Sequence, residues 1–457
     1  MNLAGPDTGK RPSPHRGLVL AAATLGFGVI QLDVSVVNVA VKPIGAALGG
    51  GVTGLQWVVD AYTLPFAALI LAAGALGDRR GAKRVLLGGF ALFTLASVAC
   101  GLVPALGVLI AARAVQGIGA AALGACSLAL LNHTFPDASE RARAVSTWAV
   151  GGAAALAAGP LVGGLLIATV GWRSIFFINV PLGAAGWWLT ARYAAETPPA
   201  RDRGVDLPGQ LAAVVGLTAL AGAKIEAGSR GFRAPVVIGG YVLAVVAGAA
   251  FLLVERTRAR PMMPLWLFRS RTFSVAVSVG LVINVVFYGL IFAFSLFWQR
   301  YEGLSPLSAG LAFVPVTVVI MASDFIAGRA IPVLGTRWVS ASGALLMGAG
   351  CLAMFGLLSA HVAALVAALV AALSVTGFGI GLIVPAITSA LLGSVDRSLS
   401  GIASGTLTAF RQTGSVLGVA LFGSLLAGMG ATAGLHTACA IAIGLVLVVA
   451  ALSFTAG

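Results

Sequence analysis

Five ionisable side chains stand inside long apolar stretches of this chain, where a bilayer would surround them. They are Asp33, Asp60, Arg113, Asp324 and Arg411. A charged group at membrane depth is costly, so each of these residues is a candidate for function. Burial favours the protonated form of a carboxyl group, and a guanidinium that approaches it favours the ionised form. An acid and an arginine whose separation changes with conformation can therefore load and release a proton.

Asp33, Asp60 and Arg113 have the spacing for such a proton site. Counting about 1.5 Å per residue along their spans places all three in the same outer-to-middle layer of the membrane. Three ionisable groups at one depth in one half are what a proton site requires. The alternative for the same residues is a static ion pair that only fixes helix packing.

Asp324 is open to two interpretations. It lies toward the cytoplasmic end of its span, shortly before Gly328. Its carboxylate can face a substrate, or it can pair with Arg329 or Arg337 just beyond the span.

The composition is that of a polytopic membrane protein. Of 457 residues, 59% are hydrophobic and only 9% are charged, whereas soluble proteins average about 25% charged residues. Long unbroken apolar runs of about 20 residues indicate membrane-spanning helices rather than a barrel. The net charge of +14 does not indicate nucleic-acid binding, because most cations fall in short loops. Cys100, Cys126, Cys351 and Cys439 lack the paired spacing of a disulfide set or a metal site.

The apolar runs predict fourteen membrane-spanning helices, and Lys and Arg orient them. Most of the 28 Lys and Arg lie on one side, which places both termini in the cytoplasm. Two extra helices, at 207–225 and 235–254, stand between two sets of six. The expected parts are a cytoplasmic tail at 1–16, an N-terminal six-helix bundle at 17–195, linkers plus the two extra helices at 196–272, and a C-terminal six-helix bundle at 273–457.

A short basic connection follows the second span and reads GALGDRRGAKR from Gly74 to Arg84. Its glycines allow a tight turn between antiparallel helices, and its acid can pair with an arginine or a helix N-terminus. The residues that define it are Gly74, Asp78, Arg79, Gly81, Lys83 and Arg84. Gly328 to Arg337 repeats its glycine and cation spacing in the second half. We expect 77–84 and 329–337 to be cytoplasmic loops.

The fifth span contains Gly159, Pro160, Gly163 and Gly164. The proline removes a backbone hydrogen bond, and the glycines let a neighbouring helix approach closely. This pattern by itself requires no more than a kinked, tightly packed helix.

Together these motifs resemble the fourteen-helix drug:proton antiporter branch of the major facilitator superfamily. The resemblance covers nearly the whole chain and rests on Gly74–Arg84, Leu32–Ala40, Gln56–Tyr62, Arg113–Ala121, Gly159–Gly164, Phe177–Pro181 and Arg411–Gly414. It implies an all-α polytopic membrane protein with the major facilitator fold, in which two six-helix bundles enclose a site at the midplane. In that family the first-span acid and the fourth-span arginine, here Asp33 and Arg113, are linked to proton coupling, and the resemblance therefore implies that these two form the proton-coupling pair. The pattern at Gly159–Gly164 marks antiporters rather than uptake symporters.

The resemblance also implies a substrate cavity. In some members an acid at the position of Asp60 bears on cationic substrates, and some members use an acid in the helix of Asp324. The residues that we expect around the substrate are Asp60, Trp57, Tyr62, Asn38, Asp324 and Arg411. Between Gly401 and Gly418 the only charge is Arg411, which weakens a claim of dication transport.

The leading interpretation is a proton-driven exporter of lipophilic compounds, cationic ones among them. The loop Gly74–Arg84 would latch the cytoplasmic ends of the bundles in one state. The alternatives are a dedicated exporter of one antibiotic or secondary metabolite, a proton-coupled uptake symporter, and a non-transporting receptor or scaffold. An enzyme is least expected, and without a G-x4-G-K-[ST] motif ATP is not the energy source. We expect a monomer in a bacterial cytoplasmic membrane whose partners are a small molecule, protons and lipids, with no nucleic acid, cofactor or metal.

Overall fold

The computed structural model describes residues 15–198, 206–258, 261, 263–359, 365–395 and 399–455, and every regular element in them is helical. The first helices are α1 (Arg16–Leu48), α2 (Gly51–Arg80), α3 (Ala82–Leu102), α4 (Leu106–Thr134), α5 (Ala138–Thr169), α6 (Ser174–Phe177) and α7 (Asn179–Tyr193). The later ones are α8 (Leu207–Arg230), α9 (Pro235–Thr257), η1 (Leu265–Arg269), α10 (Arg271–Leu296), η2 (Phe297–Tyr301), α11 (Pro306–Ser359), α12 (Leu365–Gly393), α13 (Ser400–Met429) and α14 (Ala431–Thr455). Nearly all of the expected tail at 1–16 lies outside the described residues.

The helices account for fourteen membrane spans. In the described part of the chain, thirteen helical stretches are long and apolar enough to cross a membrane. One of them, α11, contains two spans, because the backbone leaves the helical conformation at Gly335. The short α6 and α7 together make one span, Ser174–Tyr193. The prediction of an all-α protein with fourteen spans is confirmed.

Two cytoplasmic connections are shorter than the sequence suggested. Helix α2 continues to Arg80 and α3 begins at Ala82, so Gly81 alone separates them. Gly335 makes the same kind of joint inside α11. Their φ angles are +96° and +80°, a region that residues with a Cβ atom rarely adopt. The expectation of loops at 77–84 and 329–337 was wrong because a run of charges looks like a loop, although Arg and Lys are good helix formers.

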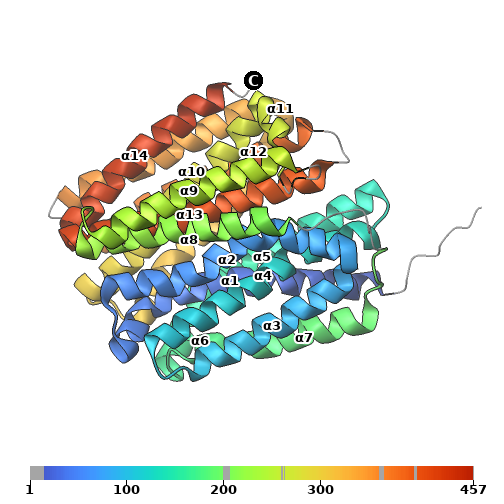
Figure 1. Ribbon diagram of the computed structural model, residues 1–457. Helices are drawn as coiled ribbons and strands as arrows, with labels where there is room; N and C mark the ends of the chain where they lie inside the picture. Colours follow the sequence, from blue (N-terminus) through green and yellow to red (C-terminus); the bar gives the residue numbers. More distant parts are fainter. Residues whose placement is uncertain are drawn as a thin grey trace, which may run out of the picture.

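The helices fall into two groups on opposite sides of a seam. Within the first group α1 packs on α4, α5 and α7, while α3 and α4 pack on each other; within the second group α10 packs on α13 and α11 packs on α12 and α14. Figure 1 shows α1–α7 in blue to green on one side and α10–α14 in yellow to red on the other. Across the seam α2 meets α13 and α5 meets α11. The expected boundaries at 17–195 and 273–457 remain a prediction.

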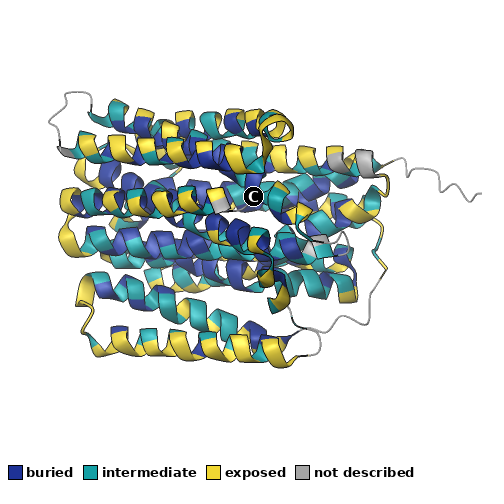
Figure 2. Ribbon diagram, turned by 90° about the horizontal axis from the view of Figure 1, so that it is seen from above, coloured by how far each residue is buried: buried dark blue, intermediate teal, exposed yellow. Residues whose placement is uncertain are grey.

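The extra helix α8 lies along the seam. It packs against α2 and α13 as well as α9, and Figure 1 shows it running between those two sides. Leu64, Ala221 and Val416, one residue from each of α2, α8 and α13, form a small apolar cluster. By contrast, only 11% of the most apolar window of α9 is buried. Figure 2 shows buried residues gathered in the middle of the bundle and exposed ones on its outer helices, as expected where lipid covers the surface.

Polar contacts across the seam lie on the side that the charge pattern assigns to the exterior. Lys42 of α1 donates to the backbone carbonyl of Gln299, and Ser295 of α10 donates to the carbonyl of Asn38. Gln56 Nε2 of α2 donates to the carbonyls of Val419 and Ala420 on α13, at 3.0 and 3.1 Å. Toward the cytoplasmic side, the side chain of Leu71 packs close to Gly405. The two halves are therefore held together mainly at their exterior ends.

Candidate proton and substrate site

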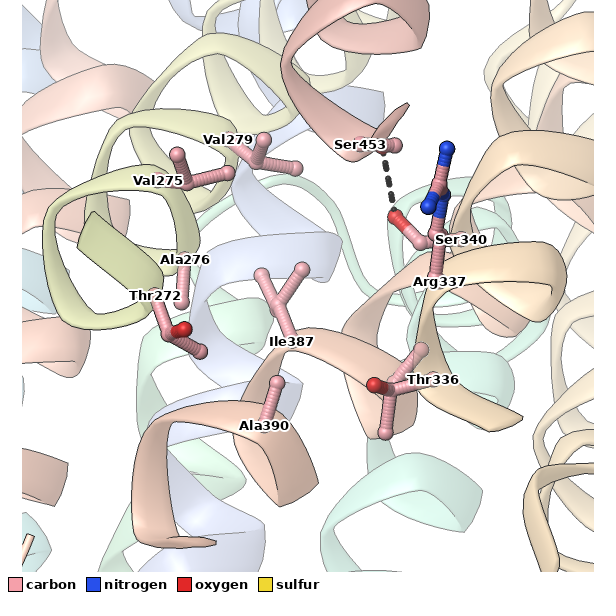
Figure 3. Close-up of a pocket in the computed structure, with 11 residues that line it drawn as sticks. Thr272, Val275, Ala276, Val279, Thr336, Arg337, Ser340, Ile387, Ala390 and Ser453 are labelled. Carbon is pink, nitrogen blue, oxygen red and sulfur yellow. Dashed lines mark hydrogen bonds between the residues drawn. The ribbon is translucent and has the colours of Figure 1, made fainter. Parts of the chain in front are cut away.

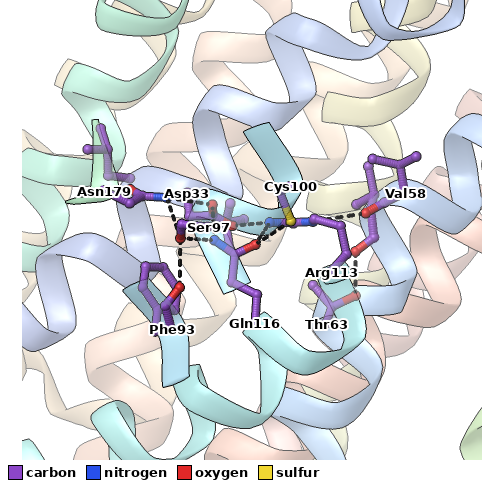
Figure 4. A network of polar contacts seen from close by, with 12 residues as sticks. Asp33, Val58, Thr63, Phe93, Ser97, Cys100, Arg113, Gln116 and Asn179 are labelled. Atoms are coloured by element: carbon purple, nitrogen blue, oxygen red, sulfur yellow. Dashed lines mark hydrogen bonds and ion pairs between the residues drawn. The ribbon is translucent and has the colours of Figure 1, made fainter. Parts of the chain in front are cut away.

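Asp33 is the centre of a buried polar network. Its side chain is 0% exposed. One oxygen, Oδ2, accepts from the guanidinium of Arg113. The other, Oδ1, accepts from Gln116 Nε2 at 2.9 Å and from Asn179 Nδ2 at 3.0 Å (Figure 4). Because an ionised carboxylate only accepts hydrogen bonds, three donors around one carboxylate stabilise its charged form.

Arg113 donates to three acceptors through Nε and one amino nitrogen. Nε donates to the carbonyl of Val58 at 3.1 Å, and one amino nitrogen also reaches Gln116 Oε1 at 2.7 Å. The guanidinium carbon lies 4.3 Å from the centre of the Tyr62 ring, within the range of a cation–π contact. The structure therefore brings together Asp33, Arg113 and Tyr62, which the sequence had placed in two separate roles.

Three further residues of this network are uncharged, and the sequence did not predict them as site residues. Ser97 of α3 accepts from Gln116 at 2.8 Å and from Asn179 at 3.4 Å, and it donates to the carbonyl of Phe93 at 2.8 Å. Gln116 and Asn179 were noticed only as members of motifs. The signal available in the sequence was an uncharged polar residue in an apolar span, which is common where helices pack.

Asp60 stands apart from the network, although it is also 0% exposed. Its Oδ1 accepts a long hydrogen bond of 3.5 Å from Thr63. Its Oδ2 is buried and has no partner in the described part of the chain, and no ion pair there includes Asp60. Asp60 is thus buried without a paired cation among the described residues.

A small cavity lies between the halves. Asn38 lines it with residues of α1, α5, α10 and α11: Val34, Ser35, Leu156, Pro160, Phe287, Tyr288, Ile291, Phe313 and Thr317. Its volume of about 30 Å³ holds a water molecule or two, whereas drug-sized pockets measure about 300–1,000 Å³. Of the expected substrate residues only Asn38 lines this cavity. Trp57 instead packs against α8, where its ring lies close to Gly222.

Asp324 forms an ion pair with neither of its predicted partners, Arg329 and Arg337. The guanidinium carbon of Arg329 lies 3.6 Å from the centre of the Phe325 ring, and that of Arg337 lies 5.8 Å from the Trp338 ring. Among the described residues no ion pair includes Asp324. The charge that acts on Asp324 is that of Arg411 on α13, beyond ion-pair distance.

The segment Gly74–Arg84 docks on the chain that follows α7. Lys83 Nζ donates to the carbonyls of Ala191 and Ala194, at 3.0 and 2.7 Å. Glu196 accepts from the backbone nitrogen of Lys83 at 3.1 Å and lies 3.4 Å from Arg84. A Cβ atom at Gly81 would come within 2.2 Å of the Glu196 carboxylate. Glu196, which the sequence placed only in a charged linker, therefore caps the start of α3.

The glycines of α5 face two helices at once. A Cβ atom at Gly159 would lie 1.7 Å from Ser35 Oγ on α1, and one at Gly164 would lie 2.8 Å from Leu307 Cα on α11. On α11, a Cβ atom at Gly310 would lie 2.2 Å from the carbonyl oxygen of Pro160. This motif is thus a close contact across the seam as well as within one half.

A second small cavity lies at the cytoplasmic ends of α10, α11, α12 and α14 (Figure 3). Ser340 and Ser453 hydrogen-bond at 2.9 Å on its wall, and Arg337 lines it. None of the acids expected in the site lines this cavity.

A bundle of fourteen spans in two halves, with a buried acid–arginine network, is the architecture of a membrane transporter. The sequence profile of the Major Facilitator Superfamily matches residues 23–419. The chain belongs to that family and is a multi-pass membrane protein.

Comparison with individual proteins agrees with this assignment. The chain is 37% identical over 421 residues to the methylenomycin A resistance protein of Streptomyces coelicolor, covering 92% of this chain and 88% of the relative. It is 37% identical over 414 residues to the multidrug resistance protein Stp of Mycobacterium tuberculosis, covering 90% and 76%. The crystal structure of the human organic anion transporter MFSD10 has the same fold, with a TM-score of 0.66 at 16% identity, and covers 96% of this chain and all of that one.

Proposed function

We propose that this protein is a proton-coupled antiporter that exports lipophilic drugs or antibiotics across the cytoplasmic membrane of a bacterium. The observation that carries the proposal is the Asp33 carboxylate, fully buried and held by Arg113, Gln116 and Asn179. Export rather than uptake is supported by the antiporter pattern at Gly159–Gly164 and by the names of the relatives. The protein works as a monomer among lipids, because its pathway forms within one chain.

Asp33 exchanges its proton as the two halves rock. In the conformation closed at the exterior, three donors hold Asp33 in its ionised form, so the proton has been released to the cytoplasm. Opening of the exterior seam moves α1 and α5 away from α10 and α11. Because Asp33 on α1 and Arg113 on α4 belong to the same half, a shift of α1 against α4 accompanies this opening and separates them, and Asp33 then takes up a proton from outside. Coupling follows if proton and substrate have different affinities for the two conformations.

Other predicted residues have supporting roles in this proposal. Asp60, buried without a cation, becomes accessible to substrate when α2 moves. Gly159 and Gly164 let α5 slide along α1 and α11. The segment from Gly74 to Arg84, with Asp78, fixes the cytoplasmic end of the first half.

A dedicated exporter of a single antibiotic is the second candidate. It is favoured by the name of the relative from Streptomyces coelicolor, while the name of the Mycobacterium tuberculosis relative at the same identity favours a broader range. Both candidates share the proton chemistry at Asp33.

Proteoliposomes with a pH-sensitive dye inside test the proposal. Lipophilic cations, neutral antibiotics and lipophilic acids are added in turn to the protein and to Asp33→Asn. We expect some compounds to trigger proton movement with the native protein and none to do so with Asp33→Asn at equal reconstituted amounts. Proton movement that is unchanged in Asp33→Asn would remove Asp33 from the mechanism.

A further inference from the structure

Arg411 is an arginine at membrane depth whose guanidinium binds nothing. In the described part of the chain its side chain makes no hydrogen bond and no ion pair, and its Nε is buried without a partner. The two contacts that the residue receives, from Asn284 at 2.8 Å and from Ser415 at 3.2 Å, are made to its backbone carbonyl. Arg113 in the first half shows the opposite pattern, since its guanidinium is paired with a carboxylate and two further acceptors.

Arg411 lies nearer the cytoplasmic side than Asp33 and Arg113 do. It lies about 16 Å from the start of α13, and Asp324 lies about 16 Å from the break at Gly335, so the two stand at one depth. Both side chains are half-buried, whereas Asp33 and Arg113 are fully buried nearer the exterior. A molecule that enters from the cytoplasm meets the Arg411 layer first.

Arg411 does not line the cavity between the halves, but one of its neighbours, Tyr288, does. The side chain of Arg411 lies over Gly280 of α10, where a Cβ atom would stand 3.1 Å from Arg411 Cγ. The titratable groups near enough to influence it are Tyr288 of α10 and Asp324 of α11. Tyr288 forms part of the cavity wall, together with Phe287, Ile291 and Phe313. An apolar, aromatic surface thus lies on one side of an unpaired cation.

We propose that Arg411 binds the anionic group of the substrate, so that the exported compounds are lipophilic acids. This inference rests on the proposed export function and names its substrate class. A guanidinium presents a planar fork of donors that matches a carboxylate. Among the acids of the central region, Asp33 is saturated by donors and Asp60 is fully buried beside Thr63, so neither offers a free carboxylate to a cationic drug. Asp324 competes with the substrate for Arg411.

Binding of three probes with one apolar body tests the inference. They are 2-naphthoate, its methyl ester, and the 2-naphthyl trimethylammonium cation, titrated by calorimetry into the full chain in nanodiscs at neutral pH, with empty nanodiscs as reference. We expect the acid to bind at least about tenfold more tightly than the ester, because hydrogen bonds between a guanidinium and a carboxylate are stronger than those to a neutral ester. Arg411→Gln should weaken binding of the acid by at least about tenfold and change the affinity for the ester by less than about twofold. Arg411→Lys should bind the acid with an affinity between those of the native protein and Arg411→Gln. Gln412→Ala, the next residue on α13, should change neither.

Asp324→Asn keeps the inference testable if Arg411→Gln does not fold. Removing the competing carboxylate should tighten binding of the acid severalfold. An equal loss of acid binding in Asp324→Asn and Arg411→Gln would instead mean that Asp324 holds Arg411 in place, and would overturn the inference. So would tighter binding of the ester or the cation, or no binding of the acid at millimolar concentration.

The two proposals fail in different ways. If the ester or the cation triggers proton movement and the acid does not, the antiport stands and the anion site is overturned. If the acid binds through Arg411 but no compound moves protons, the anion site stands and the antiport fails.

Discussion

At the scale of residues, the two acids in the first half have opposite surroundings. Asp33 accepts from three donors, while Asp60 has one long hydrogen bond to Thr63. The sequence could identify both, and Arg113, because ionisable residues are conspicuous in apolar spans. It could not identify Ser97 as a partner, because a serine in a span is ordinary and only the packing of α3 against α4 brings it to the network.

Breaking the pair Asp33–Arg113 from one side should destabilise the protein more than removing both charges. Removing one partner of a buried ion pair leaves a charge uncompensated and costs about 3–5 kcal/mol, whereas replacing both is often close to neutral. We expect Asp33→Asn and Arg113→Met each to lower the free energy of unfolding in detergent by about 3 kcal/mol. The double variant should recover at least half of either loss. Asp60→Asn, a near-isosteric change at an acid without a cation, should cost less than about 1 kcal/mol. Additive losses in the double variant would show that the two groups do not interact.

At the scale of elements, glycine determines how the helices join and how closely they pack. The fourteen spans were predictable because apolar periodicity and length are local properties of the chain. The joints between helices were not predictable. Nothing in the charges of Gly74–Arg84 shows that a single glycine, Gly81 at φ +96°, is enough to connect two helices. The docking of Glu196 on α3 depends on where α7 ends, which is a matter of tertiary structure.

Gly81 and Gly335 form a matched pair for testing these joints. Both have positive φ, so Ala at either site should cost about 1–3 kcal/mol of backbone strain. Nothing lies within 4 Å of a Cβ atom at Gly335, whereas one at Gly81 collides with Glu196. We therefore expect Gly81→Ala to lower the thermal unfolding temperature more than Gly335→Ala does. Combining Gly81→Ala with Glu196→Ala should narrow this difference in unfolding temperature from Gly335→Ala. An unchanged difference would show that the collision with Glu196 does not contribute.

Gly164 should control the exterior seam between α5 and α11. A methyl group there meets the backbone of Leu307, which cannot rotate away, so Gly164→Ala should disfavour the closed conformation by about 1–3 kcal/mol. The readout is labelling from outside of a cysteine placed at Gln299, a buried position whose backbone carbonyl keeps its contact with Lys42.

We expect Gly164→Ala to raise the labelling rate about tenfold, the change that 1.4 kcal/mol produces. Gly88→Ala, at an open site on α3, is the matched control and should have no effect. Equal labelling in the two variants would mean that close packing at Gly164 does not hold the exterior shut.

At the scale of the whole molecule, the contacts describe a transporter held closed at the exterior, with α8 spanning the seam between α2 and α13. The sequence predicted two halves around a midplane site, because hydropathy and repeated motifs are read along the chain. It could not predict which side is closed, since two conformations of one sequence differ by only a few kcal/mol. Nor could it show that Arg411 lacks a partner, because Asp324 lies at the right depth to provide one.

Transport of a compound against its own concentration gradient tests the proton role of Asp33 most directly. Proteoliposomes that contain the native protein or Asp33→Asn are loaded with a compound that triggers proton movement. The first rate measured is uphill transport driven by an imposed pH gradient. The second is exchange of labelled for unlabelled compound at equal concentrations and without a pH gradient. We predict that Asp33→Asn loses uphill transport but keeps exchange within about threefold, because substrate binding and rocking remain while the proton site is gone. Uphill transport by Asp33→Asn at the native rate would contradict the proposed proton role of Asp33.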